Sequence, residues 1–514
     1  MPIAVIDLFA GPGGLGEGFS ALRRNREPVF KIKLSIEKDP LAHRTLELRA
    51  FFRQFKDGEA PDAYYDYLTG KTTRDELFKK YSTESERASA EAWHAELGGK
   101  KFPKEIIDDA IEAALTNRVN WVLIGGPPCQ AYSLVGRSKI IGEIGLDGYE
   151  KDKRHFLYQQ YLRIIARHQP PVFVMENVKG LLSATVKKEK LFEKILADLA
   201  NPLDAVYGQP PEKREDPVSY KLVSLVTSET DEAGNFKPED FVVRAEDYGI
   251  PQARHRVILL GIRDDYFADY NLLKKRKGVV SVEDIIGEMP RLRSGLSKET
   301  DGGEEWRKAL LTMPEAKWFS DPAKMNDELR REILKLLREL DATLSRGANF
   351  TTANKRALTY HHEWKLDKKL TGICNHNTRS HIREDLHRYF FVSTFARVHG
   401  RSPLLNDFPL GLLPNHNNVA AALKETKFND RFRVQRQGRP STTITSHISK
   451  DGHYFIHYDP TQCRSLTVRE AARLQTFPDN YYFEGPRTQQ YHQVGNAVPP
   501  LLARQIAKIV ADIF

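Results

Sequence analysis

Short apolar runs alternate with amphipathic helical patterns along the first half of the chain. The apolar runs lie at residues 4–9, 31–37, 121–124, 172–175 and 257–262. Their length and their enrichment in Val, Ile and Phe predict buried strands. A helical pattern begins at about Glu17, and another covers residues 156–168. Strands that alternate with helices in this way predict an α/β fold with a parallel, doubly wound sheet and right-handed crossovers.

The alternation is interrupted twice. Residues 50–118 are charged and mostly helical in pattern, and we interpret this segment as a probable helical insertion. Residues 266–440 lose the strand–helix rhythm, which returns with a capped helix at 467–475 and an apolar terminal helix at 500–514. Because 514 residues exceed one ordinary core, we expect two domains. The first is a Rossmann-like domain of residues 1–265 plus 441–514, and the second is an irregular domain of residues 266–440.

The charge is unevenly distributed. The whole chain carries a net charge of +9, yet residues 266–440 hold 32 Lys and Arg against 22 Asp and Glu, a net +10. A basic segment within a neutral frame favours a polyanionic partner, although a solvated basic surface would give the same count. The three cysteines are too few for a disulfide framework, and no long apolar stretch or leader is visible. We expect a cytoplasmic protein that contacts no membrane.

A glycine-rich turn follows the first predicted strand. The segment Asp7–Gly14 is a strand, a glycine turn and the start of a helix, where a ligand can approach the backbone closely. Glu37 ends the next predicted strand, where a carboxylate can bind ribose hydroxyls. The pair indicates an adenosine-type cofactor. Tight-turn glycines without a ligand, or a nicotinamide cofactor, would also fit this segment alone.

Candidate catalytic or binding residues lie at or next to the ends of three other predicted strands. Cys129 follows the strand at 121–124 and a rigid Pro pair, so it is a candidate nucleophile or, alternatively, a small buried hydrophobe. Glu176 ends the strand at 172–175 and is a candidate proton donor or a surface acid. Strand alternation would place Arg254 and Arg256 on one face, where they would hold a phosphate or carbonyl oxygen or simply lie exposed.

Six segments, taken in order, resemble the motifs of the DNA cytosine-5 methyltransferase family. They are Asp7–Gly14, Gly125–Ser133 with its Pro-Cys-Gln, Glu176–Val178, Tyr248–Arg256, Leu466–Pro478 and Gln493–Pro499. The resemblance implies a Rossmann-like, S-adenosylmethionine-dependent methyltransferase domain and places a target-recognition domain at residues 266–440. The chain departs from the family pattern where we cannot place the acid for the adenine amine; Asp57 or another acid in 50–118 is the candidate.

The resemblance also implies roles for individual residues. Cys129 would add to C6 of cytosine, and Glu176 would protonate or hydrogen-bond N3 and the exocyclic amine. Arg256 would bind O2, and Arg254 would help to orient the base or the phosphate. The implied cofactor-binding residues are Phe9, Ala10, Gly11, Gly13, Gly14, Leu15, Glu37, Pro127, Asn496 and Val498. The implied DNA-binding residues are Gln130, Ser133, Arg137, Gln252, Arg433 and Arg436. Residues 131–153 look like a loop that closes over DNA, because the target base must leave the stack.

The expected partner is double-stranded DNA, together with possible cognate restriction or defence-system proteins, and we expect a monomer. Methylation of a tRNA cytosine on the same scaffold is the main alternative. Amino-group methylation would need different residues around the Pro pair, and a catalytically inactive homologue would not need Cys129, Glu176 and the two arginines. We expect no metal, because the histidines of residues 361–416 lack the spacing of zinc ligands.

Overall fold

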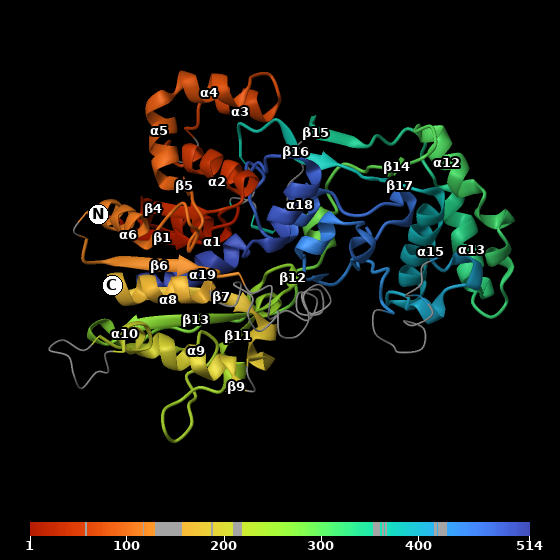
Figure 1. Cartoon of the computed structure of the whole chain (residues 1–514). Coiled ribbons are helices and arrows are strands. Elements are labelled where there is room, and N and C mark those ends of the chain that lie inside the picture. The colour runs from red at the N-terminus through yellow and green to blue at the C-terminus, as the bar shows by residue number, and fades with distance from the viewer. Residues whose placement is uncertain are drawn as a thin grey trace. The chain divides into compact units, whose positions relative to one another are not determined.

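The computed structural model of the chain forms two compact units. The structure describes residues 1–56, 59–116, 118–128, 157–186, 189–208, 218–352, 360–361, 364, 367–415, 419 and 429–514. The first unit comprises residues 1–59, 78–278 and 497–514, and the second comprises residues 60–77 and 279–496. The chain therefore passes from one unit to the other four times. Figure 1 labels the helices and strands along the chain.

A large, mostly parallel sheet forms the centre of the first unit. Its hydrogen-bonded order is β10-β13-β7-β6-β1-β4-β5, with β11 also paired to β13. Five neighbouring strands are parallel: β7 (Val172–Val178), β6 (Trp121–Gly125), β1 (Ile3–Leu8), β4 (Phe30–Glu37) and β5 (Ala92–His94). The chain proceeds outward from β1 to β4 and β5, then continues on the other side of β1 with β6 and β7. The strand order thus reverses beside β1, which is where open α/β sheets bind ligands.

The strand predicted at 257–262 is antiparallel rather than parallel, which corrects the fully parallel sheet expected from the sequence. It is β13 (His255–Arg263), and it pairs antiparallel with β7, β10 (Tyr220–Val223) and β11 (Val242–Arg244). Only residues 245–254 connect β11 to β13, and this connection is too short for the crossover helix of a parallel pair. Because β13 also runs antiparallel to β7, with Arg256 opposite Val178, β13 begins at the sheet edge where β7 ends.

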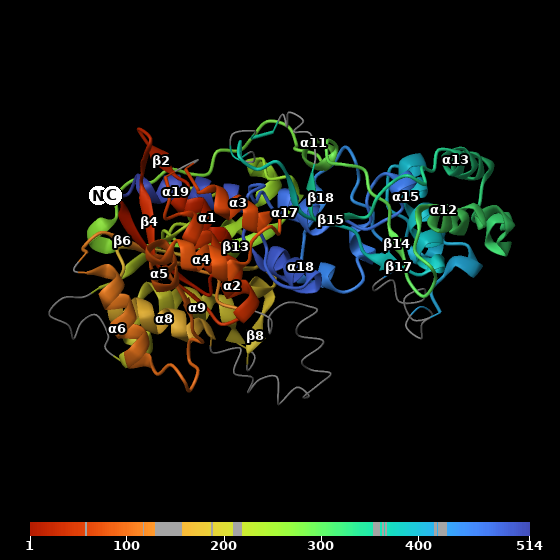
Figure 2. The ribbon, with the colours of Figure 1, turned by 90° about the horizontal axis from the view of Figure 1, so that it is seen from above.

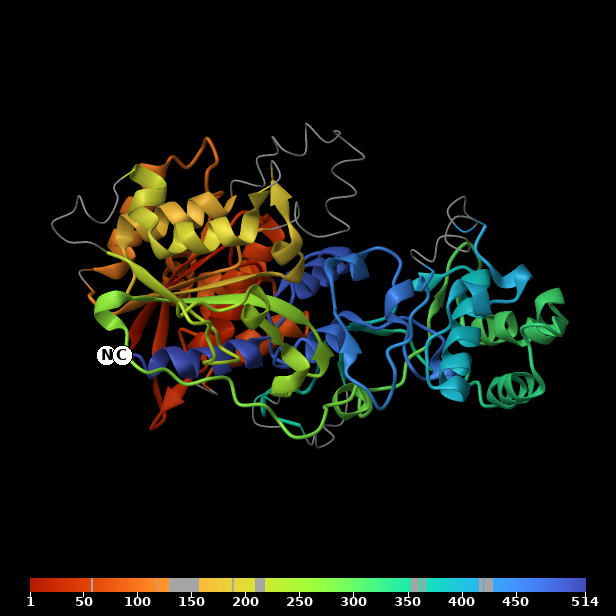
Figure 3. The same cartoon turned by 90° about the horizontal axis from the view of Figure 1, so that it is seen from below.

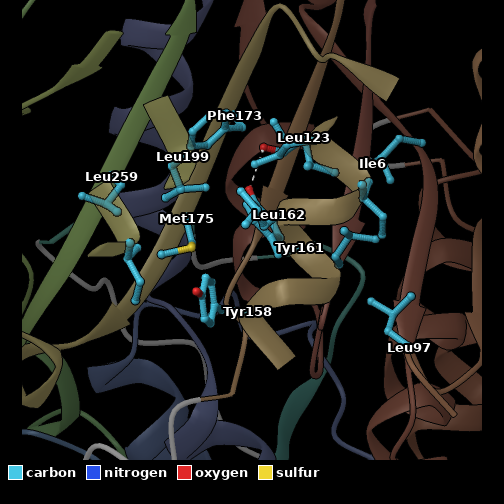
Figure 4. Packing of buried hydrophobic residues seen from close by; sticks show 14 of the residues in the cluster. Ile6, Leu97, Leu123, Tyr158, Tyr161, Leu162, Phe173, Met175, Leu199 and Leu259 are labelled. Carbon is cyan, nitrogen blue, oxygen red and sulfur yellow. Dashed lines mark hydrogen bonds between the residues drawn. The ribbon is translucent and has the colours of Figure 1, made fainter. Parts of the chain in front are cut away.

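Helices cover both faces of the sheet, as the doubly wound fold requires. On one face, α6 (Lys104–Leu115), α8 (Leu157–His168) and α9 (Leu191–Ala200) pack against apolar residues of the strands. Figure 4 shows Tyr161 and Leu162 of α8 against Leu123, Phe173 and Met175. The Tyr161 hydroxyl donates to the carbonyl oxygen of Val174 at 2.9 Å. Figure 3 shows the blue terminal helix α19 (Pro500–Ala511) on the other side of the sheet from the yellow helices.

Close packing joins the terminal helix to the glycine turn. Helix α1 (Gly14–Ser20) lies against α19, and a Cβ at Gly14 would come within 2.3 Å of the Val498 carbonyl oxygen. A Cβ at Gly18 would come within 2.4 Å of the Ala503 side chain. Glycine is therefore required at both positions for the two helices to meet. Both chain termini lie side by side on this unit (Figure 2).

The charged segment 50–118 is not an insertion throughout. It contains β5, a strand of the central sheet, and α6, which packs on the sheet. Helix α5 (Ser82–Glu91) precedes β5 and packs on α2 (Pro40–Phe52). By contrast, α3 (Asp62–Leu68) and the start of α4 (Arg74–Lys80) belong to the second unit. Only this short part, residues 60–77, lies outside the first unit.

Helices and short strands build the second unit. Helices α12 (Gly303–Leu311), α13 (Asp327–Arg338) and α15 (Arg383–His399) share an apolar core, and Figure 2 shows them close together. Among its described residues, this unit also contains α11 (Glu283–Ile286), β14 (Gly295–Leu296), β15 (Gly347–Thr352), β16 (Gly372–Asn377), β17 (Ser380–His381), β18 (Ser441–Thr442), α17 (Val468–Leu474) and α18 (Arg487–Asn496).

The predicted capping box at the start of α17 is confirmed. The Thr467 amide donates to the Glu470 carboxylate at 2.7 Å, and the Thr467 hydroxyl accepts from the Glu470 amide at 3.2 Å. The same carboxylate accepts two hydrogen bonds of 2.7 Å from the buried Arg464 guanidinium. This ion pair keeps the pKa of the fully buried Glu470 well below its usual value, although burial alone would raise it.

The compact units do not follow the domain limits expected from the sequence. Residues 441–496, with α17 and α18, are part of the second unit, whereas residues 266–278 are part of the first. The sequence predicts that the helix at 467–475 is part of the catalytic domain, because residues 466–478 resemble a motif of the DNA cytosine-5 methyltransferase family. Contacts with β16 and α11 instead group it with the irregular unit. The assignment of a target-recognition role to residues 266–440 stays a prediction.

Candidate active site

The glycine turn after β1 adopts a conformation that few side chains tolerate. Phe9 and Gly11 have φ values of 56° and 58°, and Gly13 has a φ of 97°. A non-glycine residue in the left-handed region, as at Phe9, is uncommon and tends to mark functional turns. Ala10 lies between them, and the buried Leu15 anchors the following helix. A Cβ at Gly11 would meet no heavy atom within 4 Å among the described residues, so space is open beside the turn.

Glu37 at the end of β4 lies directly against this turn. Its carboxylate accepts the Gly11 amide at 2.7 Å and the Asp39 amide at 2.7 Å. Burial raises the pKa of Glu37, and these two amides oppose the rise. The predicted pairing of the glycine turn with Glu37 is therefore present in the fold. Open space beside Gly11 and a carboxylate at the end of the neighbouring strand fit the adenosine part of S-adenosylmethionine.

A second acid, which the sequence did not identify, lies at the end of β5. The Ala95 amide donates to the Glu37 carbonyl oxygen at 3.1 Å, which places the residues after β5 beside the end of β4. Glu96 follows, and its carboxylate accepts from the Lys38 ammonium at 3.4 Å. Strand β5 has only three residues within a charged stretch, so no periodic signal revealed it. Asp57, the acid named from the sequence, lies outside the described residues.

Asp7, on β1 beneath the turn, is almost completely buried. Burial raises the pKa of this carboxyl to about 8, the nearby Glu37 charge adds to the rise, and the Arg53 guanidinium opposes it. A Cβ at Gly16 would come within 3.0 Å of its Oδ2 atom, so α1 closes over the carboxyl only because residue 16 is glycine. Asp7 therefore holds its proton to a much higher pH than an exposed aspartate does.

This shift predicts a specific pH dependence of stability. Because the pKa of Asp7 is raised in the folded state, the folded protein binds an extra proton between about pH 4 and about pH 8. The stabilisation from protonated Asp7 is complete below the pKa of the unfolded state. It declines by up to about 1.4 kcal/mol per pH unit as the pH rises toward the pKa of the folded state. We expect Asp7→Asn to gain thermal stability relative to wild type as the pH is raised from about 5 to about 8.

Calorimetric melting of both proteins across this range measures the effect. The exposed Asp75 gives a matched control, since Asp75→Asn should change the melting temperature equally at each pH. A difference between Asp7→Asn and wild type that does not depend on pH would show that the Asp7 carboxyl titrates normally.

The end of β6 carries the Pro pair that precedes Cys129. The Asn177 side-chain amide donates to the Pro127 carbonyl oxygen at 3.4 Å, and the Asn177 oxygen accepts the Val178 amide at 2.8 Å. A Cβ at Gly126 would come within 3.2 Å of a Glu176 carboxylate oxygen. The segment Gly126–Pro128 and Glu176 are therefore neighbours at one sheet edge. Cys129, Gln130, Ser133 and Arg137, and the predicted loop 131–153, lie outside the described residues.

Glu176 and the two arginines come together at the same edge. The Arg256 Nε atom lies 3.0 Å from the Glu176 carboxylate. Burial lowers the pKa of the Arg254 guanidinium, the neighbouring Arg256 charge lowers it further, and the Glu176 charge opposes both. Arg254 is thus buried and Arg256 partly buried near one carboxylate, and neither is exposed at a strand edge. Strand alternation does not bring the two arginines together, because Arg254 lies outside both strands, between β12 (Gln252–Ala253) and β13.

The loop of residues 245–254, which is closed by backbone hydrogen bonds, positions Arg254 and Arg256. The Ala245 amide donates to the Arg254 carbonyl oxygen at 3.0 Å, and the Ile250 amide donates to the Ala245 carbonyl oxygen at 3.2 Å. The His255 imidazole and the Glu246 carboxylate lie 2.7 Å apart just before Arg256. Gln252 is fully buried in this loop. The sequence did not reveal the His255–Glu246 pair, because the motif of residues 248–256 includes His255 but does not extend to Glu246.

The remaining predicted residues lie in different surroundings. Val498 packs with its backbone against Gly14, whereas Asn496 is exposed at the end of α18, with its amide 3.2 Å from the His492 ring. Arg433 forms an ion pair with Asp430 and lies over the Tyr454 ring, and Arg436 is exposed and donates to the Gly400 carbonyl oxygen at 2.8 Å. The cofactor role of Asn496 and the phosphate-binding roles of the two arginines stay predictions.

Two of the described histidines of the second unit, His376 and His387, are buried and hydrogen-bonded. His376 is buried between the Thr467 hydroxyl and the Pro290 carbonyl oxygen, and burial lowers its pKa to about 4. His387 bonds to the Ala309 carbonyl oxygen. No group of three or more potential metal ligands occurs among the described residues. None of the helices in the described part of the chain is both long and apolar enough to cross a bilayer.

The glycine turn and Glu37 lie at the switch point of a doubly wound, Rossmann-like sheet, and Glu176, Arg254 and Arg256 lie at the same edge of that sheet. The chain matches the C-5 cytosine-specific DNA methylase family over residues 81–203 and 216–511. The chain therefore belongs to this family, and its enzyme class is DNA (cytosine-5-)-methyltransferase.

Individual relatives support the assignment over the full length. The type II methyltransferase M.Bpa9945I of Bacillus paralicheniformis is 32% identical and covers 99% of this chain and 98% of its own. The DNA (cytosine-5-)-methyltransferase M.ApeKI of Aeropyrum pernix is 25% identical and covers 76% of this chain and 81% of its own. A crystal structure from E. coli, described provisionally as a prophage-encoded DNA modification methyltransferase, shares the fold with a TM-score of 0.50, 19% identity and 99% coverage of both chains.

Proposed function

We propose that this enzyme methylates C5 of a flipped-out cytosine in a specific duplex DNA sequence, through a covalent adduct between Cys129 and C6 of the base. The observation that carries the proposal is the contact between Glu176 and Arg256, at the strand end next to the Pro pair that delivers Cys129. Cytosine activation needs an acid and two cations, which lie together at this sheet edge, and a thiol, which follows the Pro pair directly in the sequence.

Each of the four proposed catalytic residues has its own role in the reaction. The Cys129 thiolate adds to C6, and the electron pair of the C5–C6 bond moves to C5. Glu176 donates a hydrogen bond or a proton toward N3 and stabilises the negative charge that forms in the ring. Arg256 binds O2, and the buried Arg254 orients the base. After C5 has gained the methyl group, a water molecule takes the C5 proton, the electrons of the C5–H bond restore the C5–C6 double bond, and the Cys129 thiolate leaves C6.

S-adenosylmethionine would supply the electrophilic methyl group. The turn of residues 9–15, with Pro127 and Val498 beside it, would hold the cofactor, and Glu37 would accept hydrogen bonds from its ribose. We propose Glu96 for the adenine amine, because it lies two residues after β5, whose last residue, His94, pairs with Glu37. The target base would reach Cys129 only by leaving the duplex, since C6 is hidden within the stack.

We expect Glu37→Ala to weaken S-adenosylmethionine binding by about 1–3 kcal/mol, because the ribose hydroxyls would lose a charged acceptor. Titration calorimetry of the chain without DNA measures this change. Glu47, an acid on α2 outside the turn, provides a control, and Glu47→Ala should bind the cofactor as wild type does. Unchanged affinity in Glu37→Ala would assign Glu37 to shaping the Gly11 turn alone.

We further propose that the enzyme is the modification partner in a type II restriction–modification system, because M.Bpa9945I is a type II methyltransferase by name. Methylation-sensitive sequencing of DNA from cells that express the chain tests both proposals. We expect 5-methylcytosine at one short recurring sequence. Methyl groups confined to tRNA would support the alternative substrate instead.

A further inference from the structure

Four consecutive basic residues, Lys274–Lys277, form an exposed segment of the first unit. All four side chains are exposed, and residues 274–277 are grouped with the sheet unit and not with the second unit. Lys274, Lys275 and Lys277 have no ion-pair partner in the part of the chain that the structure describes. Four adjacent positive charges of which three lack a counter-charge repel one another, so the protein gains no stability from them. A bound polyanion would neutralise these charges and remove the repulsion among them.

Backbone contacts hold this segment against the loop that carries the base-binding arginines. The buried Leu273 donates its amide to the Leu225 carbonyl oxygen at 2.9 Å, and the Arg276 amide donates to the Asp247 carbonyl oxygen at 2.8 Å. Asp247 precedes Gly249, and a Cβ at Gly249 would come within 2.9 Å of the Arg276 side chain. The missing side chain at Gly249 lets the methylene groups of Arg276 lie on the loop. The basic segment is therefore a fixed feature of the sheet edge on which Arg254 and Arg256 lie.

We propose that Lys274–Lys277 is a phosphate-binding segment of the catalytic unit that grips the DNA backbone beside the target cytosine. The proposal rests on the DNA-acting class of the enzyme. Lysine ammonium groups act as point charges toward phosphates, and such contacts position a protein on a duplex without reading its sequence. Duplex DNA carries one negative charge per about 1.7 Å along its axis, so a linear run of exposed lysines fits it better than a single small anion.

The test compares two double variants with the same change in charge. Lys274→Gln with Lys277→Gln removes two charges from the segment and leaves Arg276 on its loop. Arg26→Gln with Lys31→Gln removes two exposed charges near the amino-terminal ends of β1 and β4, the opposite edge of the sheet. Fluorescence anisotropy with a short labelled DNA duplex of arbitrary sequence, and with a matched RNA duplex, follows binding from about 50 to 200 mM salt.

We expect the 274/277 variant to lose up to about 0.9 in the slope of log K against log salt for each lost contact, and about 5-fold in affinity per contact near 0.15 M salt. Its S-adenosylmethionine affinity should stay at the wild-type value, and the 26/31 variant should keep the wild-type slope. A wild-type slope in the 274/277 variant, an equal loss in the 26/31 variant, or a loss seen only with RNA would overturn the proposal.

Failure of the enzymatic proposal gives a different result. If the wild-type chain does not form a covalent adduct with DNA that contains 5-fluorocytosine, the chemistry proposed for Cys129 is wrong, whatever the salt dependence. If wild type forms the adduct and the 274/277 variant keeps the wild-type slope, only the phosphate-binding role is wrong. Charge reversal to Glu at the same two lysines provides a second variant and should roughly double the loss of slope.

Discussion

Cys129→Ala should abolish methyl transfer while leaving S-adenosylmethionine binding close to wild type. Loss of a catalytic nucleophile lowers turnover by about 10⁴-fold or more in comparable enzymes. The substitution removes one sulfur atom at a residue outside the glycine turn and Glu37, so the groups that bind the cofactor are unchanged. Radiolabelled methyl incorporation into duplex DNA measures turnover, and calorimetry measures cofactor affinity in the same preparation.

Cys374, a buried cysteine of the second unit, provides the matched control. Cys374→Ala also removes one sulfur atom, and we expect it to retain turnover within about tenfold of wild type, since loss of a small buried group affects stability more than chemistry. DNA that contains 5-fluorocytosine should trap wild type in a denaturant-resistant complex, because fluorine does not leave as a proton does. Trapping by the Cys129→Ala protein would contradict the assignment of the nucleophile.

Glu176→Gln should lower turnover by about 10²- to 10⁴-fold, the usual contribution of a positioned acid. Glutamine keeps the shape and one acceptor oxygen but cannot donate a proton from a carboxyl group. It also removes the negative charge 3.0 Å from Arg256, so this guanidinium would lose its carboxylate partner and the buried Arg254 would lose a nearby opposite charge. Turnover and the Michaelis constant for DNA, measured together, separate the chemical step from binding.

Glu246→Gln is the comparison for this variant. Glu246 is also a carboxylate paired with a basic side chain, His255, in the loop before β13. It lies outside the proposed chemistry, so Glu246→Gln should keep turnover within about tenfold of wild type. If both variants lose turnover equally, Glu176 acts only by holding the loop in place.

The parts of the fold that depend on local pattern were predictable. Residues 3–8 and 30–37 form strands because their apolar runs are long, and the Gly-rich turn between them has the backbone conformation that only glycine adopts easily. The capping box at Thr467 follows from two side chains three residues apart. Each of these features is encoded within a few neighbouring residues.

Other features depend on contacts between distant segments and were missed. Strand β5 has three residues, and pairing with β4 is what makes it a strand, so Glu96 was not recognised at its end. The apolar pattern of β13 predicts a strand but does not show its direction, and the strand–helix alternation led us to expect a parallel one. In the sheet, β13 runs antiparallel to both β11 and β7. Arg254 and Arg256 do come together near Glu176, but through a closed loop and not through strand alternation.

The central claim is that this chain methylates C5 of cytosine in duplex DNA by way of Cys129. The most direct measurement is mass spectrometry of nucleosides after the purified chain has acted on duplex DNA with labelled S-adenosylmethionine, with tRNA in a parallel reaction. The account predicts label in 5-methyldeoxycytidine from DNA, no label in tRNA, and none with the Cys129→Ala protein. Label in N4-methylcytosine, in N6-methyladenine or in tRNA alone, or undiminished labelling by Cys129→Ala, would contradict it.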